Sequence, residues 1–488
     1  MEQMPVAVLV IVGIYLAGMA AIGLNAYRRV KTAADFYVYG KRIGTLFLAI
    51  ATFSSIMSGF GFVGGPGLVY AKGTSSLWIT FAQSLAFPLA YIVLGKRMRL
   101  LAEVRDVLTV PDAVYTRYRC NIARVIMAIS LLVAILAYMG TQILSAGLVM
   151  VSIFGVSLPV GLLIANGIVL FYCTVGGMIA GVDTDFAQGL IMVVASVGVF
   201  FAALITGGGM NNITTNLAKI NPDFIGPFGL MPVLTALTWY LVFVIGNSGQ
   251  PHMLHKFYMI RDPNRLAWAG LLSGVAYMLC SLLWMSVGLS MRAAVETGMA
   301  PPLSNPDLAA PTFLLKFTHP VLAGIVYGGL LAAIMSTASG FVNIGAACVA
   351  RDIPAGFGIT VKNQLAAGRW ATVVIMIIST LVAFYAKMFV AILGAVGWGL
   401  FAGAIVPTLG LGLNWKRATR EGAIAAMVYS VVFSVTVELL NRFNIWKMPH
   451  GIVSYSFSLL GAVVLFVVVS LLTKPRELET DIKAIMEI

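Results

Sequence analysis

Charged residues are scarce in this chain of 488 residues, in which Asp, Glu, Lys and Arg together account for only 10%. A soluble domain of this size carries about a quarter charged residues, so the composition excludes an ordinary soluble protein. Hydrophobic residues make up 60%, and the mean hydropathy is +0.96. The sequence therefore predicts an all-α polytopic membrane protein, because helices satisfy their own backbone groups in lipid.

Cysteines and enzyme motifs are equally few. The four cysteines lie in or beside apolar segments and lack the Cys-x-x-Cys spacing of metal sites. We therefore expect no disulfide framework, no resident metal and no cofactor. No HExxH, GxSxG or P-loop pattern occurs, which argues against an enzyme.

Apolar runs of roughly 20 residues, long enough to span a bilayer, number about thirteen. They lie near 5–27, 43–71, 74–96, 123–151, 158–180, 186–207, 231–255, 266–290, 320–349, 370–386, 390–413, 421–441 and 452–473. Basic residues follow the first run and an acidic residue precedes it. This pattern predicts a retained helix with its N-terminus outside, rather than a cleaved signal peptide.

Positive charge is distributed unevenly over the loops between these runs. Seven of the 31 Lys and Arg residues fall on the outer side, namely Lys72, Lys219, Arg292, Lys316, Lys387, Arg442 and Lys447. The others, Lys256 among them, fall on the inner side, as the positive-inside rule requires. We interpret the net charge of +13 as a topology signal and a contact with anionic lipid, not as nucleic-acid binding. The chain is thus expected in the cytoplasmic (inner) membrane with its C-terminus inside.

Two of the apolar runs are interrupted. Residues 51–67 read ATFSSIMSGFGFVGGPG, and residues 246–252, five runs later, read GNSGQPH. Broken helices are tolerated at membrane depth where they line a cavity, as in transporters, although close packing through small residues is an alternative. The matching positions predict two inverted five-helix repeats, at 43–230 and 231–414. One flanking helix with its inner loop, at 1–42, precedes them, and two helices with a short tail, at 415–488, follow.

A pair of hydroxyl residues marks a candidate cation site in the ninth run. Ala333, Ser336 and Thr337 share one helix face, where hydroxyl oxygens and opened backbone carbonyls suit a Na⁺ ion. The alternative is that both hydroxyls only bond back to the preceding helical turn. Spacing alone favours this alternative.

The chain resembles the sodium:solute symporter family, and within it the bacterial sodium/pantothenate and sodium/proline symporters. The matching stretches are FVGGPG at 62–67, Asp185 with Gln188-Gly189, GQPH at 249–252, PDL at 306–308 and AAIMST at 332–337. The resemblance covers nearly the whole chain and implies the LeuT-type inverted-repeat fold, with discontinuous helices 2 and 7. It also implies a sodium site whose ligands are the carbonyls of Ser54, Met57 and Ala333 and the hydroxyls of Ser336 and Thr337.

The sequence departs from the family pattern at two positions. Proline-type members carry an Asp where this chain has Ile56. Some members bind a second sodium through an Asp and two hydroxyls, of which Asp185 and Ser339 are present, whereas Gly340 replaces the other. We therefore expect one sodium, with a second at Asp185 and Ser339 as an alternative. Asp185 could instead be the N-cap of a helix.

The solute is expected near the membrane midplane, beside both breaks. The helix start around Gly61 to Gly65 offers N–H groups that suit a carboxylate. Comparison with proline-type relatives adds two aromatic residues and an amide, for which core packing is the alternative. The expected lining residues are Ser58, Gly59, Gly61, Tyr138, Phe243, Asn247 and Gln250. His252 and His255 could gate or relay protons, but histidines at such an interface are more often solvated.

Together these features predict a Na⁺-coupled symporter that brings a small carboxylate-bearing solute into the cell by alternating access. Pantothenate-like, monocarboxylate-like and amino-acid-like solutes all fit. A proton-coupled symporter of the same fold is the alternative, and a passive channel or a solute sensor is less favoured. The outer loop at 291–320 also contains a short apolar piece that could form a lid helix over the entrance.

Overall fold

The computed structural model describes residues 4–27, 41–105, 107–386, 390–446, 448 and 453–488. Of the basic residues assigned to the outer side, Lys387 and Lys447 lie outside these ranges. Within the described ranges every regular element is a helix, apart from one isolated parallel β-bridge between Ile43 and Ile260. The all-α prediction is confirmed for this part of the chain.

The elements fall into two groups in chain order, with short 3-10 and π turns labelled η. The first group is α1 (Val6–Tyr27), α3 (Thr45–Ile56), η2 (Phe60–Gly64), α4 (Gly65–Lys72), η3 (Gly73–Ser76), α5 (Leu77–Ala90), η4 (Tyr91–Gly95), α6 (Lys96–Val104), α7 (Val110–Tyr118), α8 (Asn121–Phe154), α9 (Leu158–Thr206), α10 (Met210–Ile220) and η5 (Pro222–Phe224). The second group is α11 (Val233–Gly246), η6 (Asn247–Gly249), α12 (Pro251–Phe257), η7 (Pro263–Arg265), α13 (Leu266–Glu296), η8 (Pro306–Leu308), α14 (Ala309–Phe317), α15 (Pro320–Ala347), η9 (Cys348–Asp352), α16 (Ile353–Gly356), α17 (Gln364–Ala386), α18 (Val390–Ile405), η10 (Val406–Leu411), α19 (Arg420–Arg442), α20 (Ser454–Leu472) and α21 (Thr480–Met486).

Among the described residues, ten helices are long and apolar enough to cross a membrane, against about thirteen expected runs. One difference lies in α9, which is helical from Leu158 to Thr206 without the expected interruption between 180 and 186. If straight, its 49 residues would measure about 74 Å, more than twice the thickness of the hydrocarbon core. This single element is therefore long enough to contain both expected runs.

Both predicted helix breaks are present. α3 ends at Ile56, and Met57 follows with an extended backbone (φ −74°, ψ 95°) before η2 and α4 continue. α11 ends at Gly246 and gives way to the 3-10 turn η6, and Gln250 is again extended before α12 begins at Pro251. Each break interrupts the helical hydrogen-bond ladder, so carbonyl groups before it lose their usual partners.

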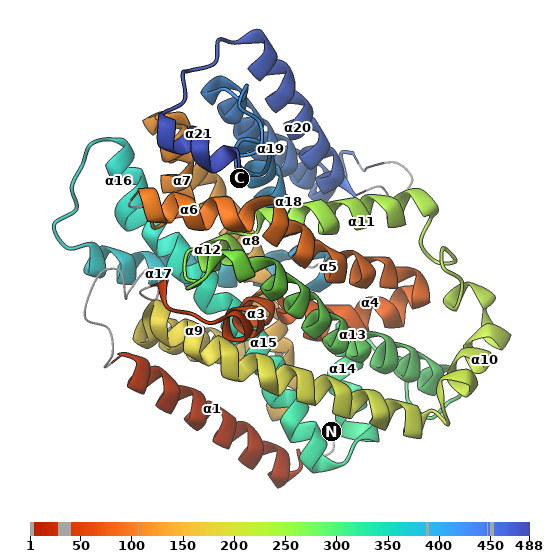
Figure 1. The fold of residues 1–488 in the computed structure, drawn as a ribbon. Coiled ribbons are helices and arrows are strands. Elements are labelled where there is room, and N and C mark those ends of the chain that lie inside the picture. The colour runs from red at the N-terminus through yellow and green to blue at the C-terminus, as the bar shows by residue number, and fades with distance from the viewer. Residues whose placement is uncertain (1–3, 28–40, 106, 387–389, 447, 449–452) are drawn as a thin grey trace.

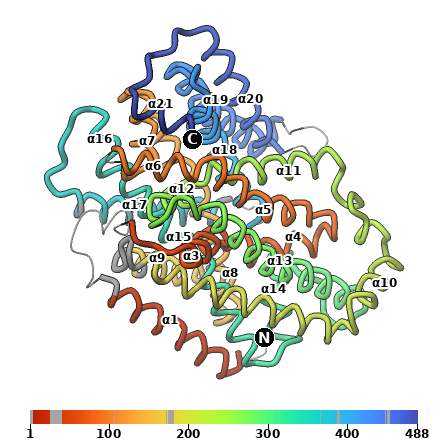
Figure 2. The backbone as a smooth tube through the Cα atoms, in the orientation of Figure 1, coloured from red at the N-terminus to blue at the C-terminus, as the bar shows by residue number. Residues whose placement is uncertain are grey.

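The broken helix α3 lies at the middle of the bundle, where it packs against α9, α12, α13 and α15. α1 lies outside, alongside α9 and α15 (Figures 1 and 2). α18 packs on α8 and α20, and α15 and α18 are the most deeply buried of the long helices. The centre of the molecule is thus built from the interrupted helices and their direct neighbours.

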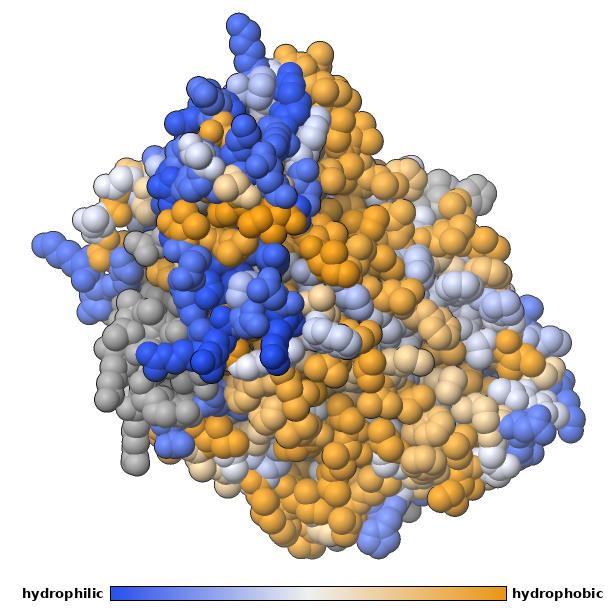
Figure 3. Space-filling model, in the orientation of Figure 1, coloured by the Kyte–Doolittle hydropathy of each residue, from blue (hydrophilic) through white to orange (hydrophobic). Residues whose placement is uncertain are grey.

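Polar surface gathers at two opposite ends of the long helices. Figure 3 shows hydrophilic side chains over α6, α16 and α21 at one end and over α10 at the other, with hydrophobic surface between them. α14 lies toward the α10 end and forms the helix expected in the loop at 291–320. α1 begins toward the same end as α14, whereas α21, near the end of the chain, packs against α6 at the other end (Figure 1). This layout fits a membrane band across the middle of the bundle.

The segments that flank the two broken helices are joined at the α6 end. The N–H of Ile43, just before α3, donates to the carbonyl of Met259 at 3.1 Å. The N–H of Arg261 donates to the carbonyl of Ile43 at 3.0 Å. Ile43 and Ile260 form the isolated parallel bridge through these bonds. The start of α3 and the chain after α12 are therefore held together by backbone hydrogen bonds.

Candidate functional site

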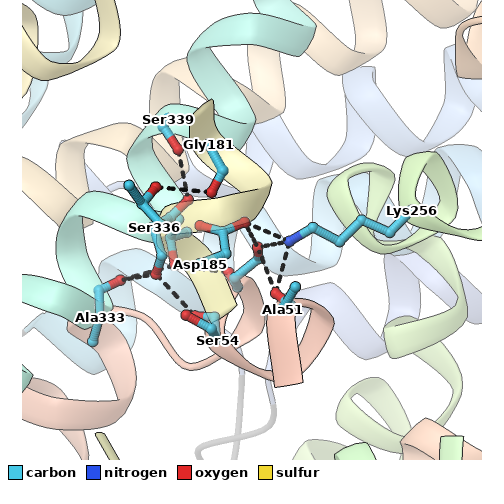
Figure 4. Close-up of polar contacts among 11 residues, drawn as sticks. Ala51, Ser54, Gly181, Asp185, Lys256, Ala333, Ser336 and Ser339 are labelled. Atoms are coloured by element: carbon cyan, nitrogen blue, oxygen red, sulfur yellow. Dashed lines mark hydrogen bonds and ion pairs between the residues drawn. The ribbon is translucent and has the colours of Figure 1, made fainter. Parts of the chain in front are cut away.

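The break after α3 frees two carbonyls that face α15. In a continuous helix the carbonyls of Ser54 and Ser55 would accept from the N–H groups four residues later. Instead, the N–H of Gly59 donates to Gln142 Oε1 of α8 at 3.0 Å. Ser54 O accepts the hydroxyl of Ser336 at 2.9 Å, and Ser55 O accepts that of Thr337 at 2.7 Å. The opened backbone of α3 is thus satisfied by side chains of α15 (Figure 4).

The two hydroxyls of α15 also share a carbonyl of their own helix. Ser336 Oγ lies 3.2 Å and Thr337 Oγ1 lies 3.0 Å from Ala333 O. The hydroxyls of Ser336 and Thr337 therefore bond to the preceding turn of α15 and also contact the broken helix α3. All three α15 residues are buried. Five oxygens, namely three carbonyls and two hydroxyls, converge without a carboxylate, which is a donor set that suits a small hard monovalent cation.

Four of the five expected sodium ligands meet in this cluster. They are Ser54, Ala333, Ser336 and Thr337. Met57, the fifth, lies at the break itself, and its N–H donates to Phe53 O at 2.8 Å. The carbonyl that Thr337 contacts is that of Ser55, a residue that the sequence had not assigned to the site.

A buried ion pair lies directly beside this cluster. Lys256 Nζ of α12 lies 2.7 Å from Asp185 Oδ2 of α9, and both side chains are almost completely buried. The ammonium also donates to Ala51 O at 2.7 Å and contacts the hydroxyl of Ser55. That hydroxyl lies 2.9 Å from Asp185 Oδ2. Figure 4 shows Lys256 extending from α12 toward the end of α3.

Three expectations about these residues need correction. Lys256 was assigned to an inner loop as a topology charge, but it is 4% exposed and neutralises a carboxylate. Asp185 is not an N-cap, because α9 begins at Ser157 and Leu158. His252 and His255 are each 3% exposed, so the expectation that they are solvated is wrong.

The two residues of the alternative second sodium site lie at one small cavity. Its lining includes Asp185, Ser339, Gly340 and Lys256. Ser339 Oγ donates to Ser336 O at 3.1 Å, so this hydroxyl is held by its own helix. Oδ2 of Asp185 has the ammonium as its partner, whereas Oδ1 has no hydrogen-bond partner among the described residues.

The expected solute-lining residues gather around the two breaks. Ser58 Oγ and the hydroxyl of Tyr138 lie 2.9 Å apart, which joins the break in α3 to α8. Phe243 of α11 stacks against Phe60 with ring centroids 5.5 Å apart. Gln250 Nε2 donates to Gly246 O at 3.1 Å across the second break. These residues are all buried, and the stacked rings of Phe60 and Phe243 connect the chain after the first break to α11, which precedes the second.

The expected row of free N–H groups around Gly61 to Gly65 is not present as predicted. The second half of the broken helix begins earlier, at Gly59 and Phe60. The N–H of Phe60 is taken by Ser58 Oγ at 3.2 Å, and that of Gly65 by the carbonyl of Phe60. Gly61 packs against Met57 and Gly65 against Trp284, so close packing through small residues accompanies the break.

Sequence reasoning missed three residues of this region. Trp284 of α13 lies edge-on to Phe60, with centroids 5.6 Å apart, and Trp398 of α18 lies 5.3 Å from Phe243. Gln142 accepts from Gly59 through Oε1. Two tryptophans and an amide inside apolar helices are unusual enough to have been a signal. However, only the fold brings them to the breaks.

Several buried polar atoms here have no hydrogen-bond partner among the described residues. The donors are Gln142 Nε2, Trp284 Nε1 and Trp398 Nε1, and the acceptors are Asn247 Oδ1 and Gln250 Oε1. Buried polar groups are normally satisfied, and an unpaired group calls for an explanation. The donors belong to α8, α13 and α18, and the acceptors lie at the second break, in η6 and at Gln250.

Solved structures of membrane transporters share this fold. A Na⁺-coupled sialic acid symporter in a substrate-bound outward-open state superposes with a TM-score of 0.78 at 18% identity, covering 96% of this chain and 99% of that one. A nucleobase-cation-symport-1 family transporter in a closed conformation gives 0.58 at 14% identity, covering 94% and 99%. The architecture is therefore that of LeuT-type transporters with interrupted helices.

The chain belongs to the sodium:solute symporter family, whose model matches residues 36–430. The expected membership is thereby confirmed. Among its relatives, an osmoregulated proline transporter of Bacillus subtilis is 26% identical over 99% of both chains. A sodium/proline symporter of Staphylococcus aureus is 27% identical over 98% of this chain and 96% of that one.

Proposed function

We propose that this protein is a secondary active transporter that carries Na⁺ together with a small carboxylate-bearing solute into the cell by alternating access. The observation that supports this most directly is the oxygen cluster between the broken helix and α15, where Ser336 and Thr337 reach the carbonyls of Ser54 and Ser55. Cargo Na⁺ would be bound by those same oxygens. Family membership and the proline symporters among the relatives agree with this assignment.

The ion links the two helices on which alternation depends. Na⁺ bound between α3 and α15 favours the state in which these helices lie together, which is the outward-open state. Inward opening separates them, removes ligands from the ion and releases it. Coupling arises because the ion has different affinities for the two states.

The repeat organisation and the orientation belong to the same proposal. The break at Met57 and Ser58 and the break at 247–250 occupy corresponding places in the units 43–230 and 231–414. Such paired interruptions are typical of inverted repeats. With about thirteen passages the N-terminus lies outside and the C-terminus inside. The start and end of the chain at opposite ends of the bundle support an odd number (Figure 1).

The unpaired donors around the breaks favour an anionic group on the solute. Gln142 Nε2, Trp284 Nε1 and Trp398 Nε1 lack acceptors among the described residues, and a carboxylate supplies only acceptors. Phe60, Phe243 and Tyr138 provide apolar and aromatic surface for the rest of the molecule. The region suits a small solute with one carboxylate and further polar groups, such as a pantothenate-like, monocarboxylate-like or amino-acid-like compound.

A ligand screen followed by uptake tests the function. The purified protein is screened by thermal shift against organic acids, amino acids and pantothenate, each with and without Na⁺. In a coupled symporter Na⁺ increases the affinity for the cargo, so a cargo raises the unfolding temperature more with Na⁺ than without. The hit is then offered to proteoliposomes with an inward Na⁺ gradient. Accumulation above equilibrium supports symport, whereas uptake that stops at equilibrium identifies a channel.

The same vesicles separate sodium from proton coupling. The buried Asp185 and Lys256 are titratable groups at membrane depth, which proton relays require. An inward proton gradient without Na⁺ drives accumulation in a proton symporter and fails in a sodium symporter. Accumulation driven by protons alone would overturn the sodium proposal.

A further inference from the structure

Lys256 places a positive charge inside an oxygen cage beside the proposed sodium site. Its Nζ is surrounded by a carboxylate oxygen of Asp185, the carbonyl of Ala51 and the hydroxyl of Ser55. These oxygens come from α3 and α9, whereas the ammonium comes from α12 (Figure 4). A carboxylate, a carbonyl and a hydroxyl are the ligand types that a protein offers to a hard metal cation. The ammonium thus occupies a position built for a cation.

This position coincides with the alternative second sodium site. Asp185 and Ser339, the two residues expected to hold a second ion, line one small cavity together with Lys256. A buried carboxylate needs a positive partner, because an isolated charge in a low-dielectric interior is strongly unfavourable. Lys256 provides that partner at 2.7 Å. A second metal ion at Asp185 would lie within a few ångströms of the ammonium and be repelled by it.

We propose that Lys256 is a tethered cation that takes the place of a second sodium, so that the protein binds a single Na⁺. The inference rests on the proposed Na⁺ symport and specifies its ion stoichiometry. The charge of Asp185 is neutralised by the protein itself in every cycle. Lys256 is a positioning residue, because it holds α3 without contacting the cargo ion or the solute.

Ser55 connects the tethered cation to the transported one. Its hydroxyl contacts Lys256 and Asp185, and its carbonyl accepts from Thr337 in the sodium cluster. The ammonium therefore fixes the turn of α3 that carries the carbonyls of the ion site. Removal of the ammonium leaves the buried charge of Asp185 without a counter-ion, with the hydroxyl of Ser55 as a neutral partner. A free Na⁺ then satisfies this carboxylate.

Direct counting of bound ions tests this proposal. Radiolabelled Na⁺ is titrated onto the purified full-length protein without solute, and the stoichiometry is measured at saturation. We expect about one Na⁺ for the unaltered protein and about two for Lys256→Ala. The Hill coefficient cannot exceed the number of sites, so a value above one is possible only for Lys256→Ala. Lys256→Arg, which keeps the charge, and the double variant Lys256→Ala/Asp185→Asn, which removes both charges, should each bind about one.

The outcomes separate the inference from the proposed function. No saturable Na⁺ binding by the unaltered protein would overturn the proposed symport itself. If the unaltered protein binds two ions, or if a folded Lys256→Ala variant binds one, the proposal that Lys256 replaces a second sodium is wrong. The proposed symport is not affected by either result. If Lys256→Ala does not fold, the number of Na⁺ ions bound by the unaltered protein and by the double variant tests the proposal. One ion in each supports the proposal, and two in either contradicts it.

Discussion

The hydroxyl of Thr337 donates to the carbonyl of Ser55 at 2.7 Å, across the gap between α15 and the broken end of α3. The two residues lie 282 positions apart in the sequence. The bond exists because α3 stops at Ile56 and Gly59 turns its N–H to Gln142. In a continuous helix the carbonyl of Ser55 would accept a hydrogen bond from the N–H of Gly59.

Substitution of Thr337 tests the hydroxyl as an ion ligand. Thr337→Val keeps the shape of the side chain but removes the oxygen. Loss of one buried polar partner costs about 1–3 kcal/mol, which corresponds to a roughly 5- to 150-fold weaker Na⁺ affinity. Thr337→Ser retains the oxygen and is the matched control. The apparent Na⁺ affinity is measured from uptake at fixed solute, and unchanged Na⁺ affinity in Thr337→Val would count against the site.

Substitution of Asn247 tests the solute region separately from the ion. Asn247 Oδ1 has no hydrogen-bond partner among the described residues, so its loss leaves no protein donor unsatisfied. We expect Asn247→Leu to keep the unfolding temperature within a few degrees and to weaken solute binding by about tenfold, the effect of one hydrogen bond of about 1.4 kcal/mol. Na⁺ affinity should be unchanged. A variant that loses Na⁺ binding while it retains the solute would reverse the assignment.

Gly65 tests how tightly the second half of the broken helix is packed. A Cβ at this position would clash with the indole ring of Trp284, whereas a Cβ at Gly13 of α1 meets nothing within 4 Å. Forced overpacking of a core typically costs about 1–3 kcal/mol. Gly65→Ala should therefore lower the unfolding temperature in detergent, and Gly13→Ala should not. Equal behaviour of the two variants would show that α4 and α13 are free to separate.

We expect Asp307, which lies between α13 and α14, to make the stability of the protein depend on pH. This carboxyl lies in η8, outside the spanning helices, where Oδ2 accepts from the N–H of Val390 at 2.8 Å and Lys72 lines the same pocket. Burial raises the pKa of Asp307 from 3.8 to about 7. The folded protein thus holds a proton that the unfolded chain releases between about pH 4 and pH 7. Stability from this group is complete below pH 4 and falls as the pH rises to about 7.

The matched variant is Asp307→Asn, whose amide oxygen still accepts from Val390. It cannot ionise, so the slope that Asp307 contributes, at most about 1.4 kcal/mol per pH unit for one proton, should disappear. Unfolding temperatures of both proteins between pH 4 and pH 8 provide the measurement. Parallel curves for the two proteins would show that another group causes the pH dependence.

The breaks were predictable because their cause is local. Glycines, Pro66 and hydroxyl residues inside an apolar run interrupt a helix wherever that run is placed. The shared face of Ala333, Ser336 and Thr337 follows from helical periodicity, which also depends only on nearby residues. These features required no knowledge of the tertiary structure.

The placement of Lys256 was not predictable, because its cause is distant. It stands next to other polar residues at the end of an apolar run, and this is the usual position of a loop lysine. Its burial depends on Asp185, 71 residues earlier, and on Ala51 and Ser55 of another helix. Gln142 likewise looks like a stray amide in α8 until Gly59 is placed beside it. Pairings of this kind are decided only when the helices are assembled.

The backbone bridge between Ile43 and Ile260 connects the two interrupted helices. It joins the chain before α3 to the chain after α12, and Lys256 adds two further attachments, at Ala51 and Ser55. These three connections join α3, the first half of one broken helix, to α12, the second half of the other. We therefore expect a tilt of α3 to move α12 with it, which couples the two breaks.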